Sequence, residues 1–172
     1  MKRLIILFSM TLIACSSMPP VLENAPVVNV QLNEVRINVN GFQSTPVRWG
    51  GTIIEVENEA NVSRIQILYY PLDSSGRPKL NESTQGRFII QSQNFLDPAI
   101  YKKDAEITVT GIVNGAVQRT IGQRVLQLPV VDIENSFLWP EEQDKYYYPP
   151  YCTGYYPSLY YGFGRRYYYP CY

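Results

Sequence analysis

The side chains of this chain that could bind or react are arginines, glutamates and cysteines, because the sequence contains no histidine. That removes Ser-His-Asp and Cys-His nucleophile pairs and the commonest metal ligand at once. Glu55, Glu57 and Glu59 alternate along one segment, and such a row could bind Ca²⁺ or transfer protons. The same spacing is typical of the solvent-facing side of a strand, which we favour. We therefore predict no catalytic residue, no metal site and no enzymatic activity.

Arginines and tryptophans in the middle of the chain suggest a binding site instead. Guanidinium groups bind phosphate or carboxylate in a bidentate way, and an indole can serve as a platform for a ligand. The candidate ligand-binding residues are Arg48, Trp49, Arg77 and Arg87. A structural alternative stays open, in which Arg77 or Arg87 pairs with an aspartate such as Asp73 and Trp49 packs in the core.

The N-terminus carries a cysteine with a chemistry of its own. Lys2 and Arg3 precede an apolar run that ends at Ile13, which is the order of a secretory signal. The run is far shorter than the ~20 residues of a transmembrane helix. The residues LIAC, ending at Cys15, resemble the bacterial lipobox, in which the signal is removed and the cysteine is lipidated. Covalent lipid on Cys15 is the only non-protein group that we expect, and it would anchor the chain to a membrane.

Four regions follow from the composition. Residues 1–14 are the signal, residues 15–29 a proline-containing lipidated tether, residues 30–140 the folded domain and residues 141–172 a tail. Without the signal, the chain has 13 Lys plus Arg and 15 Asp plus Glu. A net charge of about −2 gives no electrostatic case for binding nucleic acid.

The folded domain is rich in strand patterns. Short helices are expected in the second half of residues 27–41 and at Asp97, where Pro98 fits the first helical position. Gly50 and Gly51 indicate a bulge or a close backbone approach, and the Asn114–Gly115 pair indicates a turn. Strands are expected at residues 46–59, 63–73, 86–93, 106–115 and 124–140. This pattern predicts an all-β fold, a small five-stranded OB-like Greek-key barrel with one or two short helices, and another small sandwich or barrel is the alternative.

The tail is dominated by tyrosine and proline. Twelve of the fifteen tyrosines lie between Tyr146 and Tyr172, and four prolines with three glycines argue against a regular element there. The rings could pack on the barrel, lie at a membrane interface, stack on sugars or self-associate. Cys152 and Cys171 are a candidate disulfide pair, since an exported chain meets an oxidising compartment.

The motif series VRWGG, YPLD, GRP, QGRF, FLDPAIY, ITVTG and LWP runs from Val47 to Pro140 in the order found in one family. It resembles the Slp family of starvation-inducible outer-membrane lipoproteins. The resemblance implies an outer-membrane lipoprotein of starvation or stationary phase, with a role in envelope integrity or stress resistance and no established reaction. Ser16, after the lipidated cysteine, fits the outer membrane with the domain facing the periplasm. Expected partners are peptidoglycan, lipopolysaccharide or an envelope protein, and the alternative function is a small-ligand or glycan-binding module near Arg48, Trp49 and Arg77.

Overall fold

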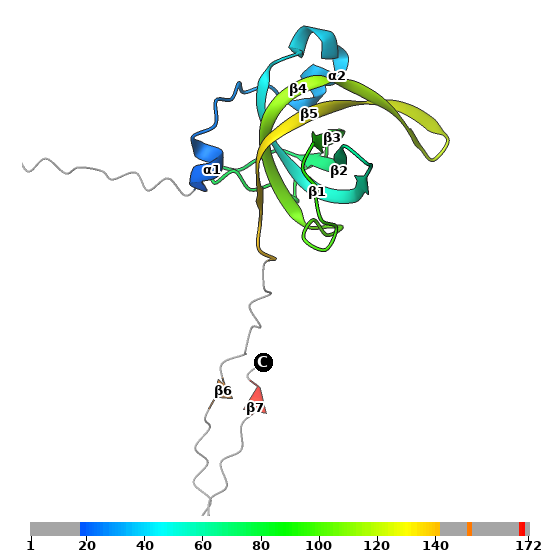
Figure 1. Ribbon diagram of the computed structural model, residues 1–172. Helices are drawn as coiled ribbons and strands as arrows, with labels where there is room; N and C mark the ends of the chain where they lie inside the picture. The colour runs from blue at the N-terminus through cyan, green and yellow to red at the C-terminus, as the bar shows by residue number, and fades with distance from the viewer. Residues whose placement is uncertain (1–17, 142–150, 153–168, 171–172) are drawn as a thin grey trace, which may run out of the picture. The chain divides into compact units, whose positions relative to one another are not determined.

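A computed structural model describes residues 18–141, 151–152 and 169–170 of the chain (Figure 1). Strands in the first of these ranges close into a barrel with the order β1-β2-β3-β5-β4. They are β1 Pro46–Asn58, β2 Ser63–Tyr70, β3 Gly86–Ser92, β4 Glu106–Ile121 and β5 Arg124–Leu138. The predicted all-β, five-stranded OB-like barrel is confirmed.

Strand pairing explains how the sheet closes. Neighbouring strands pair antiparallel except β3 and β5, which pair in parallel through Ile89↔Val130 and its neighbours. Side chains alternate across each strand, so Ile65 and Ile67 of β2 point into the barrel while Gln66 points out of it. The interior is filled by large apolar side chains, among them Trp49, Ile53, Phe88, Ile107 and Val109.

Gly51 lies where β2 passes too close for any side chain. A Cβ atom at this position would lie 1.8 Å from the carbonyl oxygen of Leu68. The close approach that the paired glycines predict is therefore confirmed. The bulge lies further along β1, between Ile53 and Glu55.

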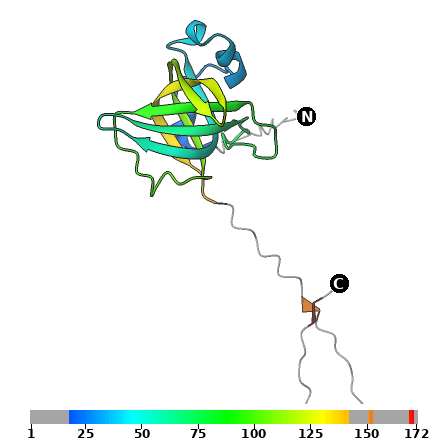
Figure 2. The same ribbon diagram turned by 90° about the vertical axis from the view of Figure 1, so that its right-hand side faces the viewer.

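In the described part of the chain, three short helices precede the barrel strands. They are α1 Pro20–Glu23, α2 Leu32–Ile37 and the 3-10 helix η1 Val39–Phe42. A capping box joins Gln31 and Glu34 at the start of α2, and Leu32 and Val35 turn one fully buried face into the core. The helix expected in this segment is confirmed, and α2 with η1 lies at the same end of the barrel in Figure 1 and Figure 2.

The tether expected over residues 15–29 is shorter than the sequence indicates. Leu22, in α1, is fully buried, and its carbonyl accepts a hydrogen bond from Arg48 at 2.6 Å. The amide of Val28 donates to Pro46 at the start of β1. The described part of this segment is therefore packed on the barrel, because an apolar side chain and strand-edge hydrogen bonds hold it there.

The helix expected at Asp97 is a single hydrogen-bonded turn. The amides of Ile100 and Tyr101 both donate to the Asp97 carbonyl, and Asp97 Oδ1 accepts from Ala99 at 2.8 Å. The chain then returns to the barrel, where Asp104 donates to the Ile53 carbonyl. No helix lies between β3 and β4, a segment that the structure describes in full.

The turn predicted at Asn114–Gly115 is wrong. β4 continues to Ile121, and Gly115, with φ +76°, lies in a bulge that shifts the register between Val113 and Ala116. The chain reverses at Gly122, with φ +61°, and the next residue. A long β4–β5 hairpin results, which extends as an arm past the rest of the barrel in Figure 1.

A second apolar cluster holds this hairpin against the outside of the barrel. Ile89 of β3 points outward, since its neighbours Phe88 and Ile90 belong to the main core. It packs with Leu128 and Val130 of the hairpin. Partly buried Val117 and Ile121 complete this cluster.

Residues 142–172 form a separate unit. The expectation that the tail has no regular element is wrong, because β6 Tyr151–Cys152 and β7 Tyr169–Pro170 pair antiparallel. Cys171 lies outside the described residues, and so does the predicted lipidation site, Cys15. Among the described residues, no helix has the length and apolar character to cross a membrane.

Candidate functional site

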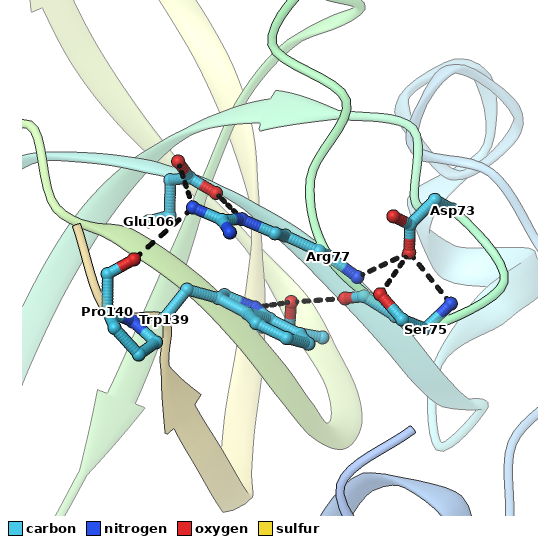
Figure 3. Close-up of polar contacts among 8 residues, drawn as sticks. Asp73, Ser75, Arg77, Glu106, Trp139 and Pro140 are labelled. Carbon is cyan, nitrogen blue, oxygen red and sulfur yellow. Dashed lines mark hydrogen bonds and ion pairs between the residues drawn. The ribbon is translucent and has the colours of Figure 1, made fainter. Parts of the chain in front are cut away.

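Arg77 is fixed between a carboxylate and an indole (Figure 3). Its Nε donates to Glu106 Oε2 at 2.6 Å and its Nη2 to Glu106 Oε1 at 3.0 Å. The guanidinium carbon lies 5.7 Å from the ring centroid of Trp139, and Nη2 also donates to the Pro140 carbonyl. Bidentate pairing and contact with an aromatic face are both strong interactions of arginine. Arg77 therefore has the structural role of the alternative prediction and fixes its loop, but its carboxylate partner is Glu106 and not Asp73.

Asp73 organises the loop that carries Arg77. Its Oδ1 accepts hydrogen bonds from the Ser75 amide at 2.8 Å, the Ser75 hydroxyl at 2.6 Å and the Arg77 amide at 2.9 Å. Burial works to raise the pKa of this carboxyl, but the hydrogen bonds from Ser75 and Arg77 and the nearby Lys79 together hold the pKa below its ordinary value. Asp73 is therefore an ionised loop residue at neutral pH.

A hydrogen-bonded chain joins this loop to the end of the barrel. Trp139 Nε1 donates to Thr108 Oγ1 at 2.9 Å, and the same hydroxyl donates to the Gly76 carbonyl at 2.7 Å. Thr108 is fully buried, so the chain is shielded from water. These bonds fix the point at which the polypeptide leaves β5.

Trp49 is a core residue. It is 1% exposed, and its ring makes edge-on contacts with Tyr69 and Phe88, at centroid distances of 6.2 and 5.3 Å. Its Nε1 donates to the Val30 carbonyl at 2.8 Å. The prediction that Trp49 lines a ligand site is corrected, because no face of its ring is open to a ligand.

Arg48 lies beside Trp49 in sequence but lines a pocket elsewhere. Its neighbours there come from the N-terminal segment and from the loop after β2, and they include Val28 and Asp73. The pocket has a volume of about 240 Å³. Arg48 and Arg87 line different cavities, so the four predicted ligand residues do not converge on one site.

Arg87 lines a groove of about 680 Å³. One wall is the outer surface of β1, β2 and β3, and the other is the end of β4 in the hairpin arm. We call this the hairpin groove. Its polar lining residues are Glu55, Glu57, Gln66, Arg87, Gln118, Arg119 and Thr120, and its apolar ones include Ile54 and Ile121.

The polar side chains of the hairpin groove pair with one another. With the Gln66 amide oriented to satisfy both neighbours, its nitrogen donates to Glu55 at 3.1 Å and its oxygen accepts from Arg87 at 2.7 Å. Arg119 forms an ion pair with Glu57 across the groove, while its Nε is buried without a partner. The groove thus presents fixed donors and acceptors with two positive and two negative side chains.

Sequence reasoning named one groove residue, Arg87, as a ligand residue and missed the others. Glu55 and Glu57 were assigned to a solvated strand face, which describes their strand but not the arm that covers it. Arg119 lies past Asn114–Gly115, where we expected a turn. The sequence of residues 116–121, AVQRTI, does not alternate between apolar and polar residues, so it gives no clear sign that the strand continues.

Among the described residues, no group of three or more His, Cys, Asp or Glu side chains could hold a metal ion.

The model of the outer membrane lipoprotein Slp family matches residues 12–171 of the chain. The chain belongs to the Slp family. The resemblance in the motif series is confirmed, and this Slp-family protein is an outer-membrane lipoprotein.

The chain is also similar to individual proteins. The chain is 29% identical over 133 residues to the uncharacterized lipoprotein YeaY of Escherichia coli (strain K12), and the matched region covers 77% of this chain and 68% of YeaY. It is 28% identical over 138 residues to the outer membrane protein Slp of the same organism, and the matched region covers 79% of this chain and 73% of Slp. A solved small single-stranded DNA-binding protein of Streptomyces coelicolor matches with a TM-score of 0.37 and 9% identity, over 55% of this chain and 94% of the other.

Proposed function

We propose that this Slp-family lipoprotein is a non-enzymatic module that supports the cell envelope in starvation or stress by binding an envelope polymer. The polymer is a glycan strand of peptidoglycan, and it lies in the hairpin groove. The observation that carries this proposal is the groove itself, a cavity of about 680 Å³ between the β4 arm and the outside of the barrel. In OB-type barrels the corresponding face and the loop between strands four and five bind extended polymers.

The charge balance of the groove favours a neutral sugar chain. Arg87 hydrogen-bonds to Gln66, which also bonds to Glu55, and Arg119 pairs with Glu57, so neither arginine is a surplus positive charge. A phosphate-rich polymer such as lipopolysaccharide would require surplus cations. Paired donors and acceptors on a rigid sheet suit hydroxyl and amide groups, which both donate and accept.

The anchor would hold this groove at the outer membrane. Lipid on Cys15 would retain the chain at the bilayer, and the Tyr/Pro-rich segment 141–172 would add a second contact with envelope components. A domain on the periplasmic side can reach the wall. Cys15→Ala should move the protein from the outer-membrane fraction to the soluble periplasmic fraction, and unchanged membrane fractionation would contradict the anchoring claim.

The alternative module at Arg48, Trp49 and Arg77 receives less support. Trp49 is buried in the core and Arg77 is bound to Glu106. Of these three residues, only Arg48 lines either of the two pockets described above. A binding site built from all three residues would therefore need the barrel to rearrange.

Cosedimentation with purified peptidoglycan sacculi tests the groove. Two variants alter it in different ways: Arg119→Ala removes a donor from its wall, and Thr120→Trp places a bulky ring in the groove from an exposed position. Arg124→Ala is the matched control, because Arg124 is exposed on the same hairpin and does not line the groove. We expect both groove variants to lose about tenfold in affinity, which corresponds to ~1.4 kcal/mol, and the control to bind as the wild type does.

Thermal unfolding of the same variants separates lost binding from lost fold. Arg119→Ala also breaks the pair with Glu57, so its effect on binding counts only if Thr120→Trp agrees. Equal sedimentation of the wild type and of two folded groove variants would overturn the proposed glycan site.

A further inference from the structure

A second pocket, which shares no lining residue with the hairpin groove, lies between the N-terminal segment and the loop after β2. Its apolar walls include Met18, Val28 and Leu72, and its charged lining residues are Arg48 and Asp73. The volume of about 240 Å³ lies below the ~300–1,000 Å³ of sites for drug-sized molecules. The pocket therefore suits a small ligand or the head of a larger one.

Arg48 brings an uncompensated positive charge to this pocket. Its Nη2 donates to the Leu22 carbonyl at 2.6 Å, and its Nε is buried with no hydrogen-bond partner. Within the described ranges, no carboxylate lies close enough to form an ion pair with it. A partly buried guanidinium without an anion is costly, so an anionic group that enters the pocket would compensate its charge.

Asp73 brings a negative charge to the same pocket. The three hydrogen bonds that shape its loop all reach Oδ1, from the Ser75 amide, the Ser75 hydroxyl and the Arg77 amide. Among the described residues, none donates to Oδ2. Oδ2 is therefore the oxygen that can accept from a ligand, and Arg48 and Asp73 face one cavity without pairing with each other.

We propose that this pocket binds a small zwitterion, with its phosphate or carboxylate on Arg48 and its ammonium group on Asp73. One ligand of this kind would compensate both the positive charge of Arg48 and the negative charge of Asp73, which line the same pocket. Among the described residues neither Asp73 nor Arg48 forms an ion pair, so an anion alone would compensate only Arg48 and a cation alone only Asp73. The apolar walls would contact the carbon atoms between the two charged groups.

Two kinds of molecule carry both an anionic group and an ammonium group: a lipid head with phosphate and ammonium groups, and a free amino acid. The lipid head is favoured by the position of Met18, which lines the pocket three residues after Cys15. Three residues span at most about 11 Å, so a lipid on Cys15 would hold the pocket close to the membrane surface. This choice of source rests on the anchoring part of the proposed function, whereas the zwitterion site itself does not.

Calorimetric titration of the mature chain carrying Cys15→Ala tests the site without its lipid. The probes are glycerophosphoethanolamine for the lipid head, alanine for the amino acid, glycerol phosphate for the anion alone and ethanolamine for the cation alone. We expect glycerophosphoethanolamine to bind about tenfold tighter than glycerol phosphate or ethanolamine. Tighter binding of alanine would keep the site and assign it to amino acids.

Variants locate the binding. Asp73→Asn keeps the Oδ1 acceptor that shapes the loop and should reduce the affinity for glycerophosphoethanolamine to that for glycerol phosphate. Arg48→Gln should abolish binding of glycerol phosphate and reduce the affinity for glycerophosphoethanolamine to that for ethanolamine, and Arg48→Lys should restore part of both. Arg124→Gln, at the exposed hairpin tip, should change nothing. Three results would overturn the proposal: equal affinity for zwitterion and anion, no saturable binding of any probe, or unchanged binding by Asp73→Asn. None of these results bears on sacculus binding.

Discussion

Arg77 and Glu106 form a bidentate ion pair, with N–O distances of 2.6 and 3.0 Å, between the loop after β2 and the first residue of β4. The side chains of both residues are about one fifth exposed, at 21% and 19%. The indole of Trp139 lies against the guanidinium, so the end of β5 is held by the same group. One arginine thus fixes the loop beside the pocket and the point where the tail begins.

Loss of this arginine should destabilise the domain. Arg77→Ala removes two charge-assisted hydrogen bonds and leaves Glu106 partly buried without its partner, which costs about 1.5–3 kcal/mol. Urea unfolding monitored by tryptophan fluorescence measures the change. Lys79→Ala is the control, because Lys79 pairs with Glu82 at the surface, at 40% and 46% exposure, and such pairs contribute ~0–1 kcal/mol. Equal effects of the two substitutions would contradict the structural role of Arg77.

Asp73 should make stability depend on pH in the acid range. Its folded-state pKa is lowered, so its contribution is fully present above the unfolded value of about 3.9 and is lost as the pH falls through the folded value. Asp73→Asn should therefore be less stable than the wild type at pH 7, and the difference should shrink below about pH 4. Urea midpoints at a series of pH values measure it, and a difference that does not change with pH would contradict the ionised hydrogen-bonded carboxylate.

Trp49 should contribute to the stability of the barrel, because its ring is buried in the core and is not a surface for ligand binding. Trp49→Ala removes a fully buried ring and should cost about 3–5 kcal/mol. Phe95→Ala removes a ring that is 69% exposed and should change stability by about 0.5 kcal/mol or less. Denaturant unfolding compares the two variants. A Trp49→Ala protein with wild-type stability would mean that the ring is not in the core.

The two cysteines of the tail should form an intramolecular disulfide. β6 and β7 pair antiparallel, which brings the segment that contains Cys152 beside the strand that ends just before Cys171. A bridge would close a loop of about 20 residues and remove unfolded-state entropy worth ~3 kcal/mol. Mass spectrometry of protein isolated from the periplasm, with and without reduction, measures the bridge. Free thiols on both cysteines would contradict it.

The barrel was predictable from the sequence because its signals are local. Alternating apolar residues such as Ile65, Ile67 and Tyr69 define strands, and Gly51 marks a backbone contact that no other residue permits. Asn114–Gly115 misled the prediction because the same dipeptide suits a tight turn and a bulge, and only pairing with β5 decides between them. The burial of Leu22 was not predictable from its proline-rich neighbourhood, since its contacts, among them the hydrogen bond from Arg48 to its carbonyl, come from residues far away in the chain.

The site was less predictable than the fold. Arg48, Arg77 and Arg87 are distinctive in sequence, yet Arg77 is bound to Glu106 while the other two line separate cavities. Which arginine keeps an open face depends on partners far away in the chain. The hairpin groove exists only because β4 and β5 extend past the barrel and pack on Ile89.

Photocrosslinking in living cells tests the central claim, that the hairpin groove binds wall glycan, most directly. A photoreactive amino acid would replace Gln118, an exposed residue that lines the groove, and in the control it would replace Ile37 of α2, which is 87% exposed and lies outside the groove. We predict that the protein crosslinked at position 118 remains with the sacculus through detergent washing and is released by a muramidase, while the control is washed away. Equal release of both proteins by detergent, or crosslinks at position 118 to protein alone, would contradict the account.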